Sequence, residues 1–160
     1  MNNLALTERT AERFWSKVEK TETCWNWIGG GVGRGYGSFW VAPRHYLAHR
    51  VSFATAHGSI PEGMVIDHKC HNHSCVNPDH LQAVTPKQNA ENRAGPMKTS
   101  QTGVRGVHPK GRKFRAAISV GGKPFRLGLY DTIAEAEQAV IEARLSYYTN
   151  SLTDKIPAAG

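Results

Sequence analysis

The segment from residue 68 to residue 80 is rich in side chains that bind transition metals. Cys70, Cys75 and His80 are spaced as Cys-x4-Cys-x4-His, and three such ligands can converge on a tetrahedral zinc ion with one position left over. Cys24 is the only other cysteine of the chain and can fill that position. We therefore expect one structural zinc site, which would tie the N-terminal part of the chain to this segment.

Two further histidines give alternatives for the fourth ligand, because His71 or His73 could take the place of His80. The three cysteines make a poor disulfide framework, since their number is small and odd. Zinc-binding thiolates must be reduced and deprotonated. A reducing compartment is therefore expected.

The charge balance indicates a polyanionic partner. The chain has 20 Lys and Arg against 13 Asp and Glu, a net charge of +7, which attracts nucleic acid or an anionic membrane surface. No run approaches the roughly eighteen apolar residues of a spanning helix, and the polar start Met1-Asn2-Asn3 is unlike a signal peptide. We expect a cytosolic protein that binds no membrane.

The first half of the chain predicts a helix followed by a pair of strands. Apolar residues at helical spacing from Ala5 to Glu19 indicate an amphipathic helix with Thr7 or Thr10 as its N-cap. Two alternating aromatic stretches, residues 24–28 and 35–41, are separated by a glycine-rich run. They predict two strands that pair across a flexible turn.

The elements around the metal-binding segment are expected to be short. Residues 46–57 have helical periodicity and end before Gly58, a natural residue after a helix. Residues 61–85 show little regular pattern, which is typical of a loop organised by metal. A short helix should begin near Thr85-Pro86 and continue to Arg93.

A second unit is expected after a small polar linker at residues 97–102. Residues 103–131 offer three short strands with turns at 109–111 and 121–122. Residues 132–148 predict a helix that begins with a capping box of Thr132 and Glu135. A three-stranded sheet backed by one helix is the simplest arrangement.

The metal-binding segment and its surroundings, from about Cys24 to Arg93, resemble the His-Cys box homing endonucleases and the related HNH family of phages, which share the ββα-metal fold. The residues that carry the resemblance are His68, Cys70, Cys75, Asn77-Pro78, His80-Leu81 and Asn89. The chain has no cysteine after Cys75, so it lacks the second zinc site of the His-Cys box enzymes. Their dimer arrangement is therefore not carried over.

The resemblance implies a role for each matching residue. His68 would be the general base, and Asn89 and Asp67 would hold a catalytic Mg²⁺ or other divalent cation. The zinc ligands would be Cys24, Cys70, Cys75 and His80, which favours His80 over its two alternatives.

The implied chemistry is physically sound. Hydrolysis of a phosphodiester needs an activated water, charge neutralisation on the phosphate and help for the leaving 3′ oxygen. His68 has an ordinary pKa close to neutrality, and carboxylate and amide oxygens suit Mg²⁺. Arg50 is a candidate phosphate contact, and Asn77 is expected to brace the loop through backbone hydrogen bonds.

The second unit carries a run of basic residues. No acidic residue lies between Lys98 and Arg126, which is the charge pattern of a nucleic-acid-binding surface. The stretches 103–107, 113–116 and 127–132 resemble the AP2 domain, whose three-stranded sheet lies in the major groove of DNA. The candidate DNA-binding residues of this unit are Arg105, Lys110, Arg112, Lys113, Arg115, Lys123 and Arg126.

Together these patterns predict an α+β protein with two domains. Residues 1–96 would form a zinc-stabilised HNH endonuclease domain, residues 97–102 a linker and residues 103–160 an AP2-like domain. The expected function is cleavage of double-stranded DNA; the competing hypothesis is a non-catalytic DNA-binding protein, and an RNA-directed protein is a weaker third. A monomer would nick one strand, whereas a homodimer could cut both.

Overall fold

A computed structural model describes residues 6–152 and 154 of the chain. It divides the chain into two compact units, residues 1–87 and 88–160. The expected boundary lay later, after residue 96. The start of the first expected helix at Ala5 and the polar N-terminus Met1-Asn2-Asn3 lie outside the described residues. No helix within the described ranges is long and apolar enough to cross a membrane.

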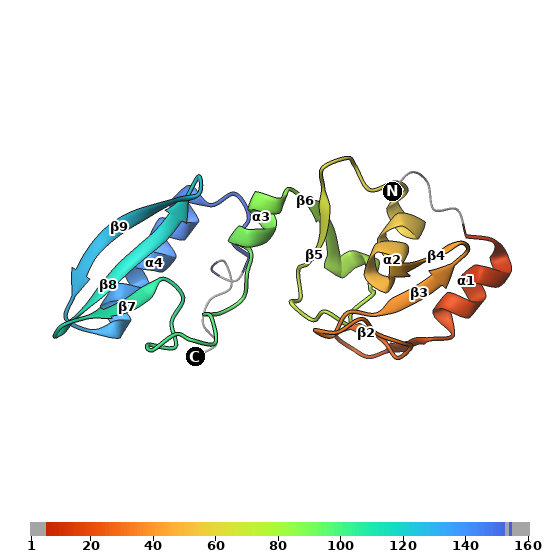
Figure 1. Cartoon of the computed structure of the whole chain (residues 1–160), viewed down its shortest axis with the longest axis horizontal. Coiled ribbons are helices and arrows are strands. Elements are labelled where there is room, and N and C mark those ends of the chain that lie inside the picture. Colours follow the sequence, from red (N-terminus) through yellow and green to blue (C-terminus); the bar gives the residue numbers. More distant parts are fainter. Residues whose placement is uncertain (1–5, 153, 155–160) are drawn as a thin grey trace. The chain divides into compact units, whose positions relative to one another are not determined.

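The first unit is built from short elements around an aromatic core (Figure 1). Its strands form three separate antiparallel pairs, β1 with β2, β3 with β4 and β5 with β6. The elements are α1 (Glu8–Trp15), β1 (Val18–Lys20), β2 (Trp25–Trp27), β3 (Ser38–Val41), β4 (Arg44–Leu47), α2 (Ala48–His57), β5 (Val65–His68), the 3₁₀ helix η1 (Pro78–His80) and β6 (Leu81–Val84).

Helix α1 packs its apolar face on the strands. The Thr7 side chain accepts a hydrogen bond from the backbone N–H of Thr10, which confirms Thr7 as the N-cap. The Phe14 ring is buried, with its centroid 5.0 Å from that of Trp27 and 5.1 Å from that of Phe39. Buried aromatic pairs of this kind contribute about 0.5–1.5 kcal/mol beyond the area they bury.

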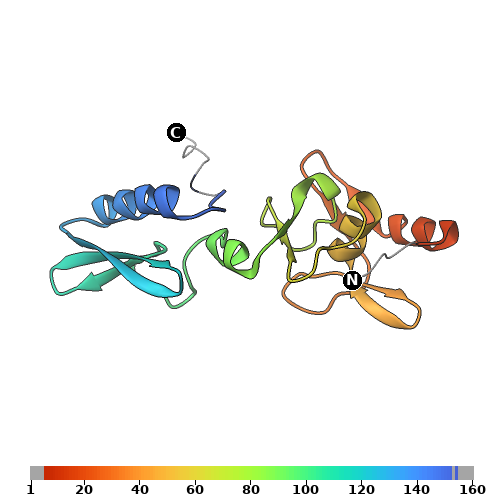
Figure 2. The same ribbon diagram turned by 90° about the horizontal axis from the view of Figure 1, so that it is seen from above.

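The expected pairing of the stretches 24–28 and 35–41 is wrong. Strand β2 pairs with β1, and β3 pairs with β4, which projects with it as a hairpin (Figure 2, orange). The two aromatic stretches do lie in one core, but through Trp27 and Phe39 side chains. The main chain between them folds back on itself, and the Trp27 indole donates to the Gly30 carbonyl at 2.9 Å.

Two other expectations around the metal-binding segment also fail in part. Helix α2 begins at Ala48 and not at Tyr46, because residues 44–47 form β4. Residues 61–85 contain the hairpin β5–β6, which the sequence did not predict. Each strand has only four residues, two of them buried, and one of the buried residues of β5 is the polar His68, so the sequence showed no clear hydrophobic alternation.

Gly37 is required by the packing of the first core. A Cβ at this position would lie 2.6 Å from Trp27 Cγ, and the Trp27 ring is buried and has no room to move. We expect Gly37→Ala to destabilise the first unit by about 1–3 kcal/mol, measured by tryptophan fluorescence during urea unfolding. Gly30→Ala is the matched control, because nothing lies within 4 Å of a Cβ there; equal stability of the two variants would contradict this packing argument.

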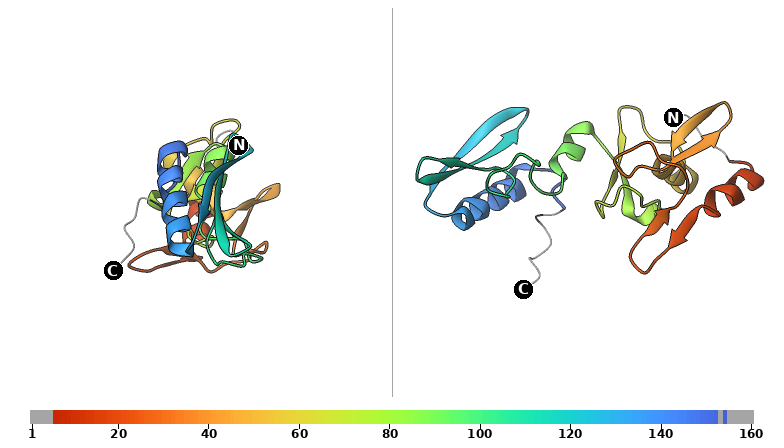
Figure 3. Two further views of the ribbon diagram at one scale, coloured as in Figure 1. Left: turned by 90° about the vertical axis from the view of Figure 1, so that its left-hand side faces the viewer. Right: turned by 60° about the horizontal axis from the view of Figure 1, so that its bottom comes forward.

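The second unit has the three-stranded sheet and helix that the sequence predicted. The strand order is β7-β8-β9, all antiparallel, and α4 runs along one face of the sheet (Figure 3, right panel). Both halves of the Thr132 and Glu135 capping box are formed. The elements are α3 (Pro86–Glu91), at the boundary of the two units, β7 (Val107–Lys110), β8 (Lys113–Val120), β9 (Lys123–Tyr130) and α4 (Ile133–Tyr147).

The end of α3 is held inside the second unit, so the unit begins earlier than residue 97. The Arg105 guanidinium donates to the carbonyls of Ala90, Glu91 and Arg93 at 2.6–3.1 Å. The buried Glu91 carboxylate accepts from the backbone N–H and hydroxyl of Thr149. The Arg105 bonds satisfy the carbonyls of Ala90 and Glu91 at the end of α3, which have no partner within the helix.

Candidate functional site

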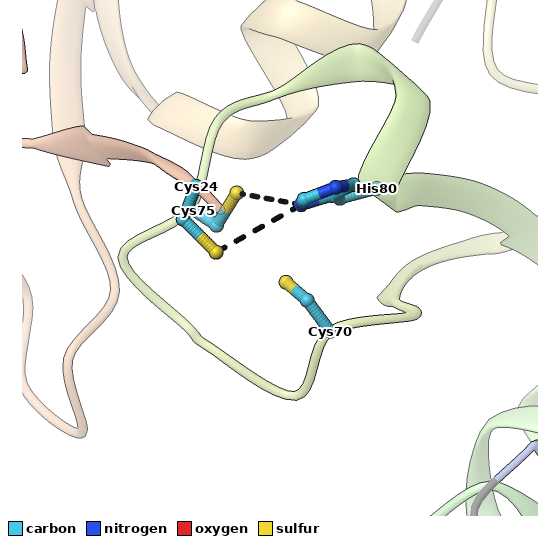
Figure 4. A group of neighbouring side chains, drawn as sticks. All are labelled: Cys24, Cys70, Cys75 and His80. Carbon is cyan, nitrogen blue, oxygen red and sulfur yellow. Dashed lines mark hydrogen bonds between the residues drawn. The ribbon is translucent and has the colours of Figure 1, made fainter. Parts of the chain in front are cut away.

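Four predicted metal ligands meet in the first unit (Figure 4). Cys24 lies just before β2, Cys70 and Cys75 lie in the loop after β5, and His80 ends η1. Their ligand atoms all lie within 4.8 Å of one another. The Nδ1 atom of His80 is 3.8 Å from Cys24 Sγ and 3.6 Å from Cys75 Sγ. Among the three candidate histidines, His80 is the one that lies in this group, as preferred from the sequence.

The main chain holds this cluster together. The β2 backbone bonds to the metal loop in both directions, from the Trp27 N–H to the Ser74 carbonyl at 2.8 Å and from the Val76 N–H to the Trp25 carbonyl at 2.7 Å. Asn77 caps η1, because its side chain accepts from the Asp79 N–H at 3.1 Å. The expected bracing role of Asn77 is confirmed, and Cys24 is brought to the loop by sheet-like pairing.

The donor set fits zinc. A tetrahedral ion with zinc–sulfur bonds of about 2.3 Å and zinc–nitrogen bonds of about 2.0 Å places its ligand atoms about 3.5–3.8 Å apart, close to the separations around His80. Without a cation, burial and the neighbouring sulfurs raise the pKa of Cys70 to about 12, and burial raises the pKa of Cys75. A divalent cation reverses this effect because it stabilises thiolates.

His68 lies at the end of β5 and is 3 % exposed. Its Nε2 lies 3.0 Å from the Cys75 carbonyl. A carbonyl can only accept, so Nε2 carries the proton and Nδ1 is left with a lone pair. Burial lowers the pKa of His68, so the ring is neutral at pH 7. His68 therefore has the tautomer and the charge that a general base needs.

Asp67 precedes His68 on β5. The Gln82 amide on the paired strand β6 donates to Asp67 Oδ2 at 3.0 Å and helps to orient the carboxylate. The negative charge of Asp67 interacts with both His68 and Tyr36 and contributes to raising the pKa of each. Asp67 thus offers a hard oxygen ligand beside the base.

Three aromatic residues that the sequence did not assign to catalysis surround His68. Tyr36, His49 and His73 have ring centroids 6.0, 4.8 and 6.0 Å from the His68 centroid. His49 is 4 % exposed, and its Nδ1 has no hydrogen-bond partner among the described residues. Burial, followed by His68 and other nearby positive groups, lowers the pKa of His49 to about 3. Tyr36 belongs to the alternating stretch 35–41, which predicted a strand and gave no sign of a role beside His68.

Two other predicted residues are placed as follows. Arg50 is half-buried on α2 beside His49, whose pKa its charge helps to lower. Asn89 is exposed on α3, and its role as a cation ligand stays a prediction from the sequence.

The basic residues of the second unit do not share one role. Ala116 and Ile118 on β8 are buried against α4, so Arg115 and Ala117 point to the open face of the sheet. Arg126 pairs with Ala117 and is exposed on the same face. The exposed residues Lys110, Arg112, Lys113 and Lys123 lie at or next to the two turns of the sheet.

Two of these basic residues already have partners. Lys113 forms an ion pair with Asp131 at 2.9 Å on the surface. Arg105 is held by the three carbonyls near the end of α3, and burial lowers its pKa. Its guanidinium is used within the unit, so Arg105 is left out of the DNA-binding face considered below.

Comparison with known proteins agrees with the site in the first unit. A family model described as HNH endonuclease matches residues 46–91. This range contains His68, the two loop cysteines, His80 and Asn89.

Phage proteins are also similar to the chain. Protein 7.7 of Escherichia phage T7 is 40% identical over 70 residues, covering 44% of this chain and 54% of that protein. Protein 2.8 of the same phage is 33% identical over 82 residues, covering 49% of this chain and 55% of that protein. The chain thus spans about half the length of these two relatives. No solved structure matches.

Proposed function

We propose that the chain is a metal-dependent DNA endonuclease in which His68 activates water and the Cys24, Cys70, Cys75 and His80 cluster holds a structural zinc ion. One observation carries the proposal: the hydrogen bond from His68 Nε2 to the Cys75 carbonyl, which leaves Nδ1 as the proton acceptor. The match of residues 46–91 to the HNH endonuclease model supports it.

The carbonyl that orients the base belongs to a zinc ligand. Cys75 therefore links the structural zinc site to the base, because its sulfur belongs to the cluster and its carbonyl orients the His68 ring. In the reaction, Nδ1 takes a proton from water, the water oxygen bonds to phosphorus, and the bond from phosphorus to the 3′ oxygen breaks. The leaving 3′ oxygen takes up a proton from solvent water. Two ends with a 5′-phosphate and a 3′-hydroxyl result.

The scissile phosphate also needs positive charge nearby. Mg²⁺ or another divalent cation would supply it when bound, and the half-buried Asp67 carboxylate is the residue of the first unit that would hold it. Arg50 on α2 is proposed to contact a DNA phosphate.

The second unit is proposed to bind double-stranded DNA, by its likeness to the AP2 domain. The open face of its sheet presents Arg115 and Arg126, and the turns on either side add the exposed Lys110, Arg112 and Lys123. Such a face gives affinity by neutralising phosphates, and this affinity falls as salt rises.

Arg126 provides the test of this face. We expect Arg126→Ala in the full chain to weaken binding to a duplex and to reduce the slope of log affinity against log salt by about 1, measured by fluorescence anisotropy without divalent metal. Lys113→Ala is the control and should change the slope less, since Asp131 already neutralises Lys113. An Arg126→Ala slope equal to that of the unaltered protein would exclude this residue from the contact.

The proposed function is tested by incubating the zinc-loaded protein with supercoiled plasmid and Mg²⁺. Open-circular or linear DNA is the expected product. DNA binding with no cleavage under any divalent metal would instead favour a non-catalytic DNA-binding protein.

A further inference from the structure

Tyr36 lies near the proposed base and belongs to the glycine-rich loop between β2 and β3. Its ring stacks on His73 with centroids 4.4 Å apart and an interplanar angle of 11°. The same ring lies 5.3 Å from His49 and 6.0 Å from His68, centroid to centroid. Tyr36 is thus one wall of the space around His68.

The loop is shaped to bring Tyr36 to this place. Gly33, Arg34 and Gly35 all have positive φ angles, of 93°, 52° and 82°, and a residue other than glycine rarely adopts such a backbone. His73 Nδ1 lies 2.9 Å from the Arg34 carbonyl, so it donates to it and joins the loop to the metal loop. The backbone of this loop therefore brings Tyr36 close to His68, although the two residues are far apart in the sequence.

The Tyr36 hydroxyl is free to donate a hydrogen bond to a ligand. It makes no hydrogen bond to any of the described residues, although its ring is half-buried. The hydroxyl is not among the buried polar atoms that lack a partner, so water or a ligand can reach it. Burial and the charge of Asp67 raise the Tyr36 pKa above its ordinary value, so the hydroxyl keeps its proton at neutral pH and can donate it to a hydrogen bond.

We propose that Tyr36 is a further catalytic residue, whose hydroxyl donates a hydrogen bond to a non-bridging oxygen of the scissile phosphate. This inference rests on the proposed function. His68 must accept a proton and so cannot supply a donor from Nδ1, whereas the phosphate gains negative charge on its oxygens as water attacks. Tyr36 keeps its proton throughout, and its bond to the phosphate becomes stronger in the transition state.

The test is Tyr36→Phe, which removes the hydroxyl and keeps the ring that stacks on His73. Removing one donor to a transition-state oxygen typically lowers the rate about 10²-fold. We expect a fall of this order in the single-turnover cleavage rate with Mg²⁺, while zinc content, melting temperature and duplex affinity stay within about twofold or a few degrees of the unaltered protein. Tyr46→Phe is the matched control; Tyr46 lies on β4 with its hydroxyl bonded to Arg44, and this variant should cut at the unaltered rate.

The outcomes separate this inference from the proposed function. If the unaltered protein does not cut DNA, the proposed function fails. If the unaltered protein cuts and Tyr36→Phe cuts as fast, the function stands and the role of Tyr36 is overturned. A Tyr36→Phe variant that loses stability and rate together would also overturn it, since the hydroxyl would then support the fold; Tyr36→Leu, which removes the stacked ring, gives the size of that structural effect.

Discussion

Replacing His68 by alanine is expected to lower the rate of Mg²⁺-dependent DNA cleavage by about 10³-fold, within the range that general acid–base catalysis supplies. The variant has no group at the Nδ1 position to take a proton from water. It should still bind a duplex, because the basic residues of the second unit are unchanged. The measurement is the single-turnover conversion of supercoiled plasmid, with duplex affinity determined on the same preparations.

A second histidine controls for the general effect of replacing an imidazole by a methyl group. His57 is exposed at the end of α2 and contacts Phe53, so His57→Ala should cut at close to the unaltered rate. Because His68 is buried, zinc content and melting temperature must be measured for His68→Ala as well. A folded, zinc-loaded His68→Ala protein that cuts at the unaltered rate would remove His68 from the role of base.

Loss of the zinc ion is expected to unfold the first unit. Zinc binding supplies on the order of 10 kcal/mol to small zinc domains, whereas a domain of this size has a net stability of about 5–15 kcal/mol. Cys75→Ser removes a fully buried ligand. Without this ligand, zinc no longer fixes the position of the residue 75 carbonyl, to which His68 bonds. We expect less than one zinc ion per chain by elemental analysis and a loss of the cooperative fluorescence transition. All four tryptophans belong to the first unit, so fluorescence reports on this unit alone.

The same assay distinguishes the fourth ligand. His80→Ala should lose zinc as Cys75→Ser does, whereas His71→Asn should retain it. Asparagine is chosen because residue 71 has a φ of 56°, which asparagine tolerates well. Full zinc content in Cys75→Ser, or a zinc loss in His71→Asn equal to that in His80→Ala, would contradict the ligand set.

The metal cluster was predictable because its information is local. Cys70, Cys75 and His80 lie within eleven residues, and metal chemistry restricts which side chains can take part. Cys24 followed by elimination, since no other cysteine exists. The second unit was also predictable from short-range signals. The Thr132 capping box marks the start of α4, and the turn at 121–122 joins the paired strands β8 and β9.

The rest depended on contacts between distant residues. Nothing near Tyr36 in the sequence shows that it stacks on His73, and the pairing of β2 with β1 depended on where the aromatic side chains pack. Arg105 illustrates the same limit on the basic run, because its charge suggested DNA whereas its guanidinium bonds to carbonyls near the end of α3. Charge can be counted in a sequence, but its partners are set by the fold.

One loop is proposed to serve both a structural and a hydrolytic metal, and plasmid cleavage with zinc measured in the same sample tests this division. Protein with one bound zinc ion and no other divalent metal should leave supercoiled plasmid intact. Addition of Mg²⁺ should convert the plasmid to open-circular or linear DNA with 3′-hydroxyl ends, while the zinc content stays at one ion per chain. Plasmid that remains supercoiled across Mg²⁺, Mn²⁺ and Ca²⁺, although the zinc-loaded protein binds it, would contradict the claim.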